Sequence, residues 1–335
     1  MSVEVLQPGL CTTIQDIGRY GYQQYGVIVS GAMDPVAFRL ANLLVGNPEN
    51  EAALEMTLIG PKLKFNGDQL IAICGGEFSA AIDGKRIPSW RPILVRDGSV
   101  LECGHVEKGC RAYMAFAGGM DVPYVLGSRS TYIRAGVGGY KGRLLKKGDQ
   151  LQVKQPKANS LRLRGLLSGK HLNEPCKVAD WRISEHLLPS YESSTIRVIP
   201  GPQFDQFTFA SRKSFFEQEF FITQASDRMG YRLSGKALEL EQPLELLSEA
   251  VTAGTIQVPS DGQPIILMVD RQTTGGYPKI GFIASVDIPI VAQRKPGEKI
   301  CFKEIHLQEA QQALFKRERM INIAAHGIDL IESRK

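Results

Sequence analysis

Two parts of the sequence carry the same short motifs in the same order, and this repetition restricts the possible folds more than any other feature. Residues 16–31 contain Asp, Arg, Gly and Tyr in that order before a Ser-Gly pair, and residues 227–235 do the same. Each half also has a glutamate five residues before a glycine, at Glu55 and Glu249. Because several coincidences in one order are uncommon by chance, the sequence predicts an internal duplication.

The segments between these motifs are short and β-prone, and glycine or proline turns separate them. The 34 glycines and 18 prolines among 335 residues favour many turns. Short strands with turns every 8–12 residues or so are typical of antiparallel barrels. We therefore expect a mainly β protein of two tandem β-barrel domains related by internal duplication, with a few short helices. The expected boundaries are 1–155 for the first domain, with a glycine-rich insertion at 111–140, 156–194 for a connecting segment, 195–304 for the second domain, and 305–335 for a C-terminal helix and tail.

The distribution of charged, apolar and metal-binding residues excludes several classes of function. The net charge of +5 is spread along the chain, which favours anionic small substrates over nucleic acid. No apolar stretch is long enough to span a membrane, and the N-terminal residues do not resemble a secretory signal. The six cysteines and five histidines are scattered without metal-binding spacing. We expect a cytoplasmic protein with reduced thiols, no metal site and no membrane partner.

One loop near the C-terminal end has an unusual density of chemically useful side chains. Residues 269–279 read V-D-R-Q-T-T-G-G-Y-P-K and follow a short apolar strand. Two adjacent glycines allow a backbone to approach a ligand closely. A polar hairpin end is the alternative interpretation. The candidate site residues in this loop are Asp270, Arg271, Thr273, Thr274, Gly275, Gly276, Tyr277 and Lys279.

Further candidates come from the repeated cluster and from the glycine-rich insertion. If the two barrels pack as a pair, equivalent loops should meet in a cleft, where small ligands often bind. Arginine suits carboxylate and phosphate groups because its fork donates two hydrogen bonds at once. Alternatively, these arginines hold turns together by donating to backbone carbonyls. The residues concerned are Asp16 and Arg19 in the first half, Ser128 and Arg129 in the insertion, and Arg228 and Arg232 in the second half.

Several longer motifs resemble a known family. They are T-T-I-Q-D-I-G-R-Y-G, V-S-G-A-M-D-P, G-S-R-S-T, I-Q-V-P-S-D-G-Q-P and D-R-Q-T-T-G-G-Y-P, spread over nearly the whole chain from Val3 to Phe302. They are similar to the biotin-dependent carboxyltransferase family, also called the allophanate hydrolase subunit 2 family, which includes the C subunit of 5-oxoprolinase. The resemblance implies that both expected barrels are cyclophilin-like.

The resemblance also implies an activity and partners. Family members that are 5-oxoprolinase C subunits act with 5-oxoprolinase subunits A and B to hydrolyse 5-oxoproline to L-glutamate, with ATP going to ADP and phosphate. A further implied role is binding and antagonism of a KipI-type inhibitor of a sporulation histidine kinase. No Walker motif is present, so ATP should be shared with or bound by the partner subunits. No biotinyl-lysine sequence is present, so biotin is not expected on this chain. Biotin-dependent carboxyl transfer to a urea-type acceptor and a purely regulatory binding protein are the alternatives.

Within that chemistry the candidate residues receive provisional roles. Attack on a stable lactam requires donors around the anion that develops on the carbonyl oxygen. Arg19, Arg228, Arg271 and Lys279 would handle anionic groups. Asp270 or Asp16 would act as base or orienter, and Tyr277 and Thr273 would position the substrate.

Overall fold

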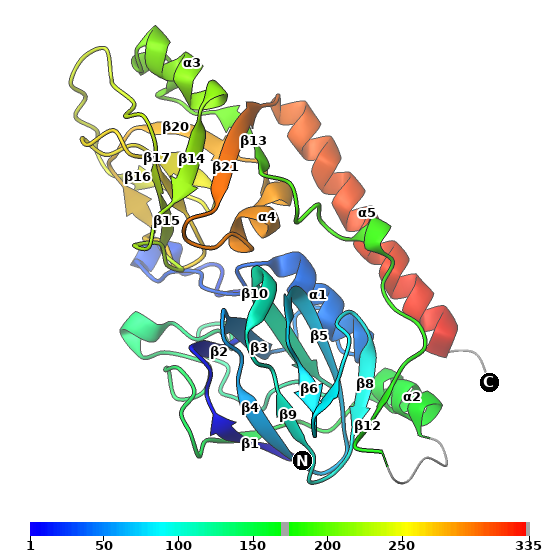
Figure 1. Ribbon diagram of the computed structural model, residues 1–335. Helices are drawn as coiled ribbons and strands as arrows, with labels where there is room; N and C mark the ends of the chain where they lie inside the picture. The colour runs from blue at the N-terminus through cyan, green and yellow to red at the C-terminus, as the bar shows by residue number, and fades with distance from the viewer. Residues whose placement is uncertain (169–173, 333–335) are drawn as a thin grey trace. The chain divides into compact units, whose positions relative to one another are not determined.

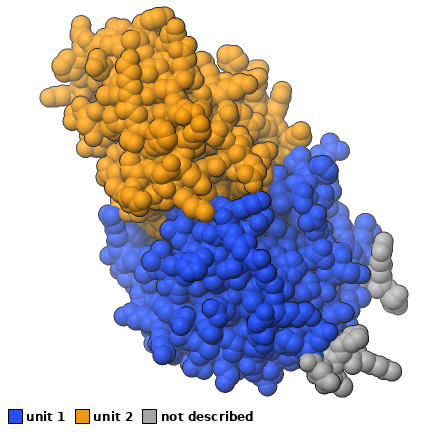
Figure 2. Space-filling view, in the orientation of Figure 1, with its two compact units in different colours: residues 1–19, 34–188, 319–335 blue, residues 20–33, 189–318 orange. Residues whose placement is uncertain are grey.

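The computed structural model describes residues 1–168 and 174–332, and the chain divides into two compact units (Figures 1 and 2). Unit 1 comprises residues 1–19, 34–188 and 319–335, and unit 2 comprises residues 20–33 and 189–318. Each unit has its own hydrophobic core. None of the helices in the described part of the chain combines the length and the apolar character needed to span a bilayer.

Unit 1 is built from two six-stranded sheets that share one core. The first sheet has the order β11 (Gln150–Gln152), β1 (Ser2–Gln7), β4 (Lys62–Asn66), β9 (Val100–Glu102), β6 (Ala81–Ile82) and β7 (Lys85–Arg86). The second has the order β12 (Cys176–Val178), β8 (Pro92–Val95), β5 (Gln69–Phe78), β10 (Val106–Phe116), β3 (Ala53–Thr57) and β2 (Cys11–Gln15).

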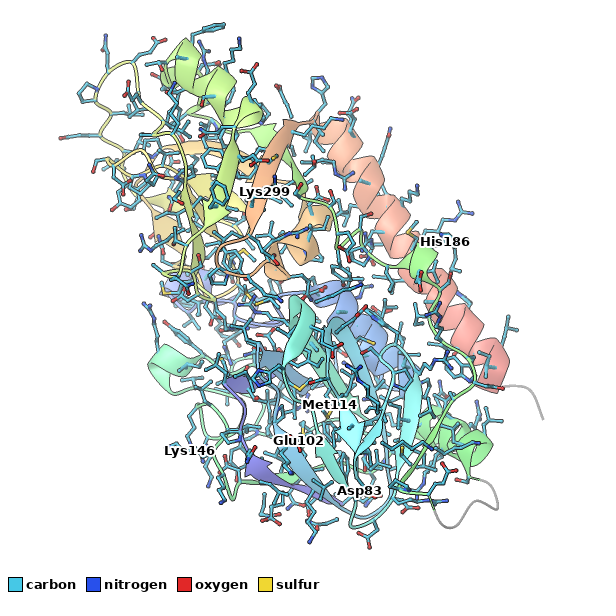
Figure 3. All side chains as sticks on the ribbon, in the orientation of Figure 1. Asp83, Glu102, Met114, Lys146, His186 and Lys299 are labelled. Atoms are coloured by element: carbon cyan, nitrogen blue, oxygen red, sulfur yellow. The ribbon has the colours of Figure 1, made fainter. Side chains whose placement is uncertain are left out.

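The alternation of side chains along the strands explains how the two sheets enclose this core. In β4 the apolar Leu63 and Phe65 are buried, and the intervening Lys64 is exposed. Successive side chains of a strand point to opposite faces, so one face of β4 packs inward and the other meets solvent. The second sheet contributes Leu54 and Met114 to the same core, and Figure 3 shows Met114 among the side chains of unit 1.

Within the described residues, three helices belong wholly or partly to unit 1. Helix α1 (Pro35–Leu44) begins after Asp34, whose carboxylate accepts hydrogen bonds from the Val36 and Ala37 N–H groups. Helix α2 (Ala158–Leu167) and the C-terminal helix α5 (Leu307–Glu332) are the others. Two short 3₁₀ turns, η2 (Ile133–Ala135) and η3 (Glu185–Leu187), complete the unit.

Unit 2 is a closed barrel with the strand order β13 (Thr195–Pro200), β20 (Lys279–Ile283), β17 (Thr255–Gln257), β18 (Ile265–Leu267), β15 (Gly230–Ser234), β14 (Glu219–Ile222) and β21 (Lys299–Glu304). Aromatic packing fills part of its core, with the Phe215 and Phe302 rings stacked at 4.7 Å between centroids. A separate two-stranded ribbon joins β16 (Glu249–Ala250) to β19 (Thr274–Gly275). The remaining elements are α3 (Phe209–Glu217), α4 (Ile288–Ala292), η1 (Gln23–Tyr25), η4 (Phe204–Gln206) and η5 (Ser285–Asp287).

The mainly β fold class is confirmed, with few helices and a closed seven-stranded barrel in the second half. In the first half the strands are divided between two sheets that enclose one core. The cyclophilin-like character and the common origin of the two halves stay predictions.

The boundaries of the units differ from the predicted domain boundaries in three places. Residues 20–33 belong to unit 2, where Met33 packs in the core and the Ser30 N–H donates to the Val269 carbonyl. Residues 156–188 belong to unit 1, because β12 pairs with β8 instead of serving only as a connection. Residues 305–318 belong to unit 2 and residues 319–332 to unit 1, so helix α5 is divided between the two units.

Candidate functional site

The Asp16 carboxylate organises the glycine-rich insertion of unit 1. Asp16 is buried and accepts hydrogen bonds from the Ser128 and Ser130 hydroxyls, at 2.6 Å and 2.5 Å. It also accepts from the Arg129 and Gly18 backbone N–H groups, at 2.6 Å and 2.9 Å. With both oxygens occupied by the protein's own donors, Asp16 orients the loop and has little capacity to remove a proton from a substrate.

Arg19 supports the same insertion. Its side chain has no exposed surface, and its Nε and Nη2 donate to the carbonyls of Val125 and Ser130 at 3.1 Å and 3.0 Å. Gly138 lies against this arrangement at φ +71°, where a Cβ would come within 2.1 Å of the Ser130 oxygen. Arg19 therefore takes the carbonyl-binding role that the sequence left open as the alternative to substrate contact.

Arg129 is the one predicted unit 1 residue whose charge lies near the surface. Its guanidinium lies 5.0 Å from the centre of the Tyr124 ring. Its Nη1 is 3.8 Å from a Glu51 carboxylate oxygen, which also binds Lys154. The contact with Glu51 is long and shared, so it holds Arg129 weakly.

In unit 2, Arg228 and Asp270 form a buried ion pair. Two guanidinium nitrogens of Arg228 donate to the two carboxylate oxygens of Asp270 at 2.9 Å and 3.1 Å. Arg228 also donates to the Gly31 carbonyl at 2.7 Å, so it connects residues 20–33 to the barrel. Both carboxylate oxygens of Asp270 are thus engaged by Arg228, which makes Asp270 an orienter of that arginine.

Arg271 follows that pair directly and is held less completely. Its Nε and Nη1 each donate to a backbone carbonyl, those of Val251 and Met268, at 3.2 Å. Burial lowers the pKa of Arg271, and the nearby Tyr20 and Asp270 partly oppose that effect. Arginine nevertheless stays charged near neutral pH because the ordinary pKa of its guanidinium lies far above neutrality. Among residues 1–168 and 174–332 no hydrogen bond to its Nη2 is found, so this nitrogen can take an anionic ligand.

Lys279 is a second cation with an exchangeable partner. Its side chain is 3% exposed, yet its Nζ donates at 2.6 Å to Glu249, whose own side chain is 58% exposed. The neighbouring Gln257 is buried and opposite Lys279 in the β17–β20 register. Gly275 packs against that glutamine so closely that a Cβ would lie 2.6 Å from its Nε2. The β16–β19 ribbon thus covers a buried polar patch on the outside of the barrel.

The other predicted residues of unit 2 have less constrained positions. Thr273 contributes its carbonyl to a hydrogen bond from the Val251 N–H at 3.1 Å. Thr274 is exposed on β19, and Tyr277 is half-exposed. Arg232 is exposed on β15. The structure therefore brings together Arg228, Asp270 and Arg271 as one group, and Lys279 and Gly275 as another.

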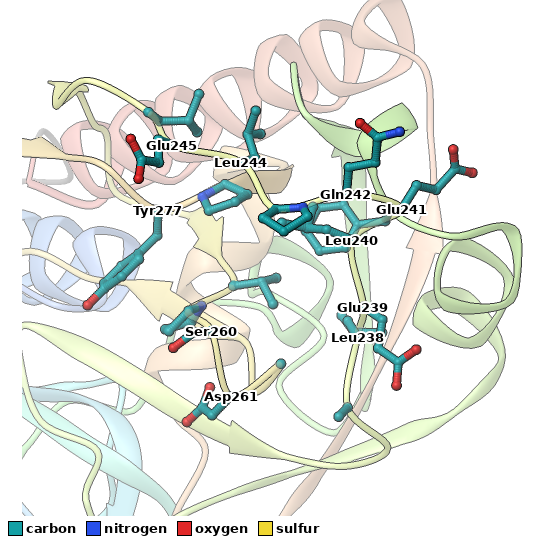
Figure 4. Close-up of a pocket in the computed structure, with 18 of the residues that line it drawn as sticks. Leu238, Glu239, Leu240, Glu241, Gln242, Leu244, Glu245, Ser260, Asp261 and Tyr277 are labelled. Atoms are coloured by element: carbon teal, nitrogen blue, oxygen red, sulfur yellow. The ribbon is translucent and has the colours of Figure 1, made fainter.

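Gly276 and Tyr277 also line a cavity of 890 Å³ in unit 2 (Figure 4). Its other walls come from residues 237–246 and 258–262, with Phe207 and Pro278. Four carboxylates line it and no lysine or arginine of the described residues does, so it lacks the cations that the sequence associated with this loop.

Glu249, Gln257 and the cavity wall at residues 237–246 were not among the predicted site residues. The alternation of leucine and glutamate at residues 238–241, just before Pro243, is the sequence signal that could have identified the wall. Within the described ranges, no group of three His, Cys, Asp or Glu residues is arranged to hold a metal ion. The predicted meeting of loops from both domains in one cleft stays a prediction.

Comparison with known proteins gives consistent matches. The family model described as "Carboxyltransferase domain, subdomain A and B" matches residues 25–304. The C subunit of 5-oxoprolinase from Escherichia coli is 38% identical over 95% of this chain and 96% of that protein, and its Haemophilus influenzae counterpart is 37% identical over 94% and 95%. The crystal structure of Kluyveromyces lactis urea amidolyase is 35% identical with a TM-score of 0.86, covering 96% of this chain and 20% of that one.

Proposed function

This chain belongs to the carboxyltransferase domain family, and from that premise we propose that it is the C subunit of an ATP-dependent 5-oxoprolinase. The observation that carries the proposal is the match to a 5-oxoprolinase C subunit along nearly the whole length of both chains. The complex would hydrolyse 5-oxoproline to L-glutamate, with ATP going to ADP and phosphate. A C subunit implies other subunits, and we propose that 5-oxoprolinase subunits A and B are those partners.

The chemistry requires the carbonyl group of a stable five-membered lactam to be activated. Transfer of the ATP γ-phosphoryl group to the lactam oxygen makes the carbonyl carbon more electrophilic. Water then adds to that carbon and the C–N bond breaks, which frees the amine and leaves an acyl phosphate. A second water hydrolyses the acyl phosphate to the glutamate carboxylate and phosphate. Negative charge is present throughout, on the ring carboxylate and on the phosphoryl oxygens, so cationic and N–H donors are needed around the substrate.

In unit 2, Arg271 and Lys279 are the residues that we assign to those anionic groups. Arg271 has a guanidinium nitrogen without a hydrogen bond in the described part of the chain, on a side chain fixed by two others. Lys279 is paired with a carboxylate that remains largely in water, so an anionic substrate can replace Glu249 at little cost. Asp270 fixes Arg228 near Arg271, and Thr273 and Tyr277 position the substrate.

The predicted residues of unit 1 receive a supporting role in this proposal. Asp16, Arg19 and Ser128 shape the glycine-rich insertion, and Arg129 is the candidate there for contact with an anion. We propose that ATP is bound by the partner subunits or shared with them, since this chain has no Walker motif. The cytoplasm is the proposed compartment because ATP is available there.

The direct test is reconstitution. The purified chain is mixed with the A and B subunits from the same organism, 5-oxoproline and ATP, and glutamate is measured with each chain omitted in turn. We expect glutamate only from the complete mixture. Undiminished glutamate formation without this chain would refute the proposal.

Carboxyl transfer is the second candidate, and the likeness to urea amidolyase favours it. In that case the same cations would hold a carboxylated cofactor carried by another protein, with a urea-type acceptor. Incubation with a carboxylated biotin carrier protein and urea would transfer label from the carrier to urea. We expect no transfer above the rate without this chain.

A regulatory role is compatible with the enzymatic one, because the B subunit would be the KipI-like partner. We propose that the chain binds this KipI-type inhibitor and thereby relieves its inhibition of a sporulation histidine kinase. Restoration of kinase autophosphorylation by the added chain would support the role, and unchanged inhibition at saturating chain would exclude it.

A further inference from the structure

The cavity of unit 2 is strongly acidic, although the whole chain has a net charge of +5. Glu239, Glu241, Glu245 and Asp261 line it, and Figure 4 shows their side chains distributed round it. In the described part of the chain, none of these four carboxylates forms an ion pair with a lysine or arginine. Four negatively charged groups around one cavity favour a cationic ligand and disfavour 5-oxoproline and ATP, which are anions.

The walls between these carboxylates are apolar. Phe207, Leu238, Leu240, Val258 and Tyr277 contribute side chains to the lining. A volume of 890 Å³ is within the range of sites that enclose a drug-sized ligand or a few residues of a peptide. The ligand that matches this lining has apolar groups together with positive charge.

The backbone beside the cavity offers an unused strand edge. Residues 206–208 pair with residues 239–241 on one side, through hydrogen bonds from Thr208 N–H to the Glu239 carbonyl and from Glu241 N–H to the Gln206 carbonyl, each at 2.9 Å. The Leu240 N–H and carbonyl therefore point to the opposite side. No hydrogen bond to that N–H is found in the two described ranges. Such an edge can accept an extended peptide as an additional strand.

The loop that carries this edge is long and irregular. It spans residues 235–248 between β15 and β16, and Leu247 within it is 90% exposed. Connections of this length without secondary structure are uncommon and usually serve a binding function. Exposed apolar groups, unpaired carboxylates and an open backbone edge thus occur in the same loop.

We propose that this cavity docks an extended segment of a partner protein in which lysine or arginine alternates with apolar residues. The apolar side chains would enter the cavity, the cations would meet the four carboxylates, and the peptide backbone would pair with the edge at Leu240. The inference depends on the cavity's own chemistry and holds whether or not the chain is a 5-oxoprolinase component.

Fluorescence anisotropy with the full-length chain tests the proposal, using a labelled Leu-Lys-Leu-Lys-Leu peptide and a matched Leu-Glu-Leu-Glu-Leu peptide. We expect saturable binding of the lysine peptide only, weakened by salt. The double substitution Glu241→Gln/Glu245→Gln should raise its Kd at least about fivefold. The control Glu77→Gln/Glu304→Gln removes the same charge from exposed strand positions and should leave the Kd unchanged.

Two further measurements separate the possible occupants. N-methylation of the central amides should weaken the lysine peptide if its backbone pairs with the strand edge. N-acetyl-lysinamide should compete only at far higher concentration than the peptide. The proposal is overturned if neither peptide saturates, if both bind equally, or if the Glu241/Glu245 variant binds like the control. Equal competition by N-acetyl-lysinamide would assign the site to a small cation instead.

Discussion

The glycine-rich insertion of unit 1 and the 269–279 loop of unit 2 have similar compositions. They differ in how far their charged groups are already bound by the protein itself. In the insertion, the Asp16 carboxylate is occupied by the loop's own hydroxyls and amides, and the fully buried Arg19 guanidinium donates to two of the loop's carbonyls. In the second loop, Arg271 keeps a guanidinium nitrogen available and Lys279 has a partner that lies largely in water. A high density of polar side chains therefore does not identify a site, because what matters is whether their hydrogen bonds are already used.

The arginines of the repeated cluster make the same point. Arg19 donates to neutral carbonyls, whereas Arg228 is neutralised by Asp270. The aspartates of the two clusters behave alike, since Asp16 and Asp227 each accept a hydrogen bond from the N–H group two residues later. Both clusters thus share the turn that follows the aspartate, but the arginines of the two clusters bind different partners.

The largest effect should follow the loss of the Asp16 carboxylate. Asp16→Ala leaves two buried hydroxyls and two backbone N–H groups without their acceptor, so we expect about 4 kcal/mol less unfolding free energy for unit 1. Urea denaturation measures this change. Asp121→Ala removes an exposed carboxylate and should alter stability by less than about 0.5 kcal/mol. Equal midpoints for the two variants would contradict the structural role of Asp16.

Lys279→Met should reduce turnover strongly with a smaller effect on folding. Removal of one donor to developing negative charge commonly lowers turnover by about 100-fold. Lys299→Met is the matched control, because Lys299 (Figure 3) also pairs with a glutamate at 2.6 Å but is exposed on β21. Glutamate formation by the complete complex is the measurement. Similar turnover in the two variants would remove Lys279 from the site.

A pH-dependent effect of intermediate size should come from the Arg143–Asp149 pair in unit 1. Arg143 donates to both Asp149 oxygens at 2.7 Å and 2.8 Å, and these hydrogen bonds lower the pKa of Asp149. A lowered folded-state pKa gives stability that is present above the unfolded value of about 3.9 and is lost as the pH falls further. Arg143→Gln should cost about 1 kcal/mol at pH 6 and much less at pH 2. Urea denaturation at both pH values measures the loss of unfolding free energy. A larger loss at pH 2 than at pH 6 would contradict the prediction.

The smallest effect is expected for Arg232→Gln. Arg232 is exposed on β15, so its loss should change the unfolding free energy by less than about 0.5 kcal/mol. The turnover of the complex that contains this variant should also change by less than about twofold. A large loss of activity would show that an exposed strand residue reaches the substrate, and would extend the site beyond the 269–279 loop.

Much of the fold was predictable from local patterns. Asp34 and Pro35 define the start of α1, and the alternation in β4 defines a strand with one buried face. The assignment of residues 20–33 to unit 2 was not predictable, because it depends on Met33 entering a distant core and Ser30 pairing with Val269. Local propensity contains no information about such long-range contacts.

The candidate site was predictable only as a set of residue types. The 269–279 loop was identified by its glycines and charges, but the sequence could not distinguish the fully buried Arg19 from Arg271, which is partly exposed. That distinction arises from carbonyls far away in the chain, such as Val125 for Arg19 and Val251 for Arg271. The acidic cavity was missed because the leucine and glutamate alternation at residues 238–241 also fits an ordinary strand.

The most direct test of this contrast is phenylglyoxal modification of the assembled complex, with and without 5-oxoproline and ATP, read by peptide mass spectrometry. Phenylglyoxal reacts with accessible guanidinium groups, and the exposed Arg232 serves as an internal control. We expect Arg271 to be modified in the free complex and protected by the substrates, while Arg19 stays unmodified in both. Equal modification of Arg271 in both conditions, or substrate-sensitive modification of Arg19, would contradict it.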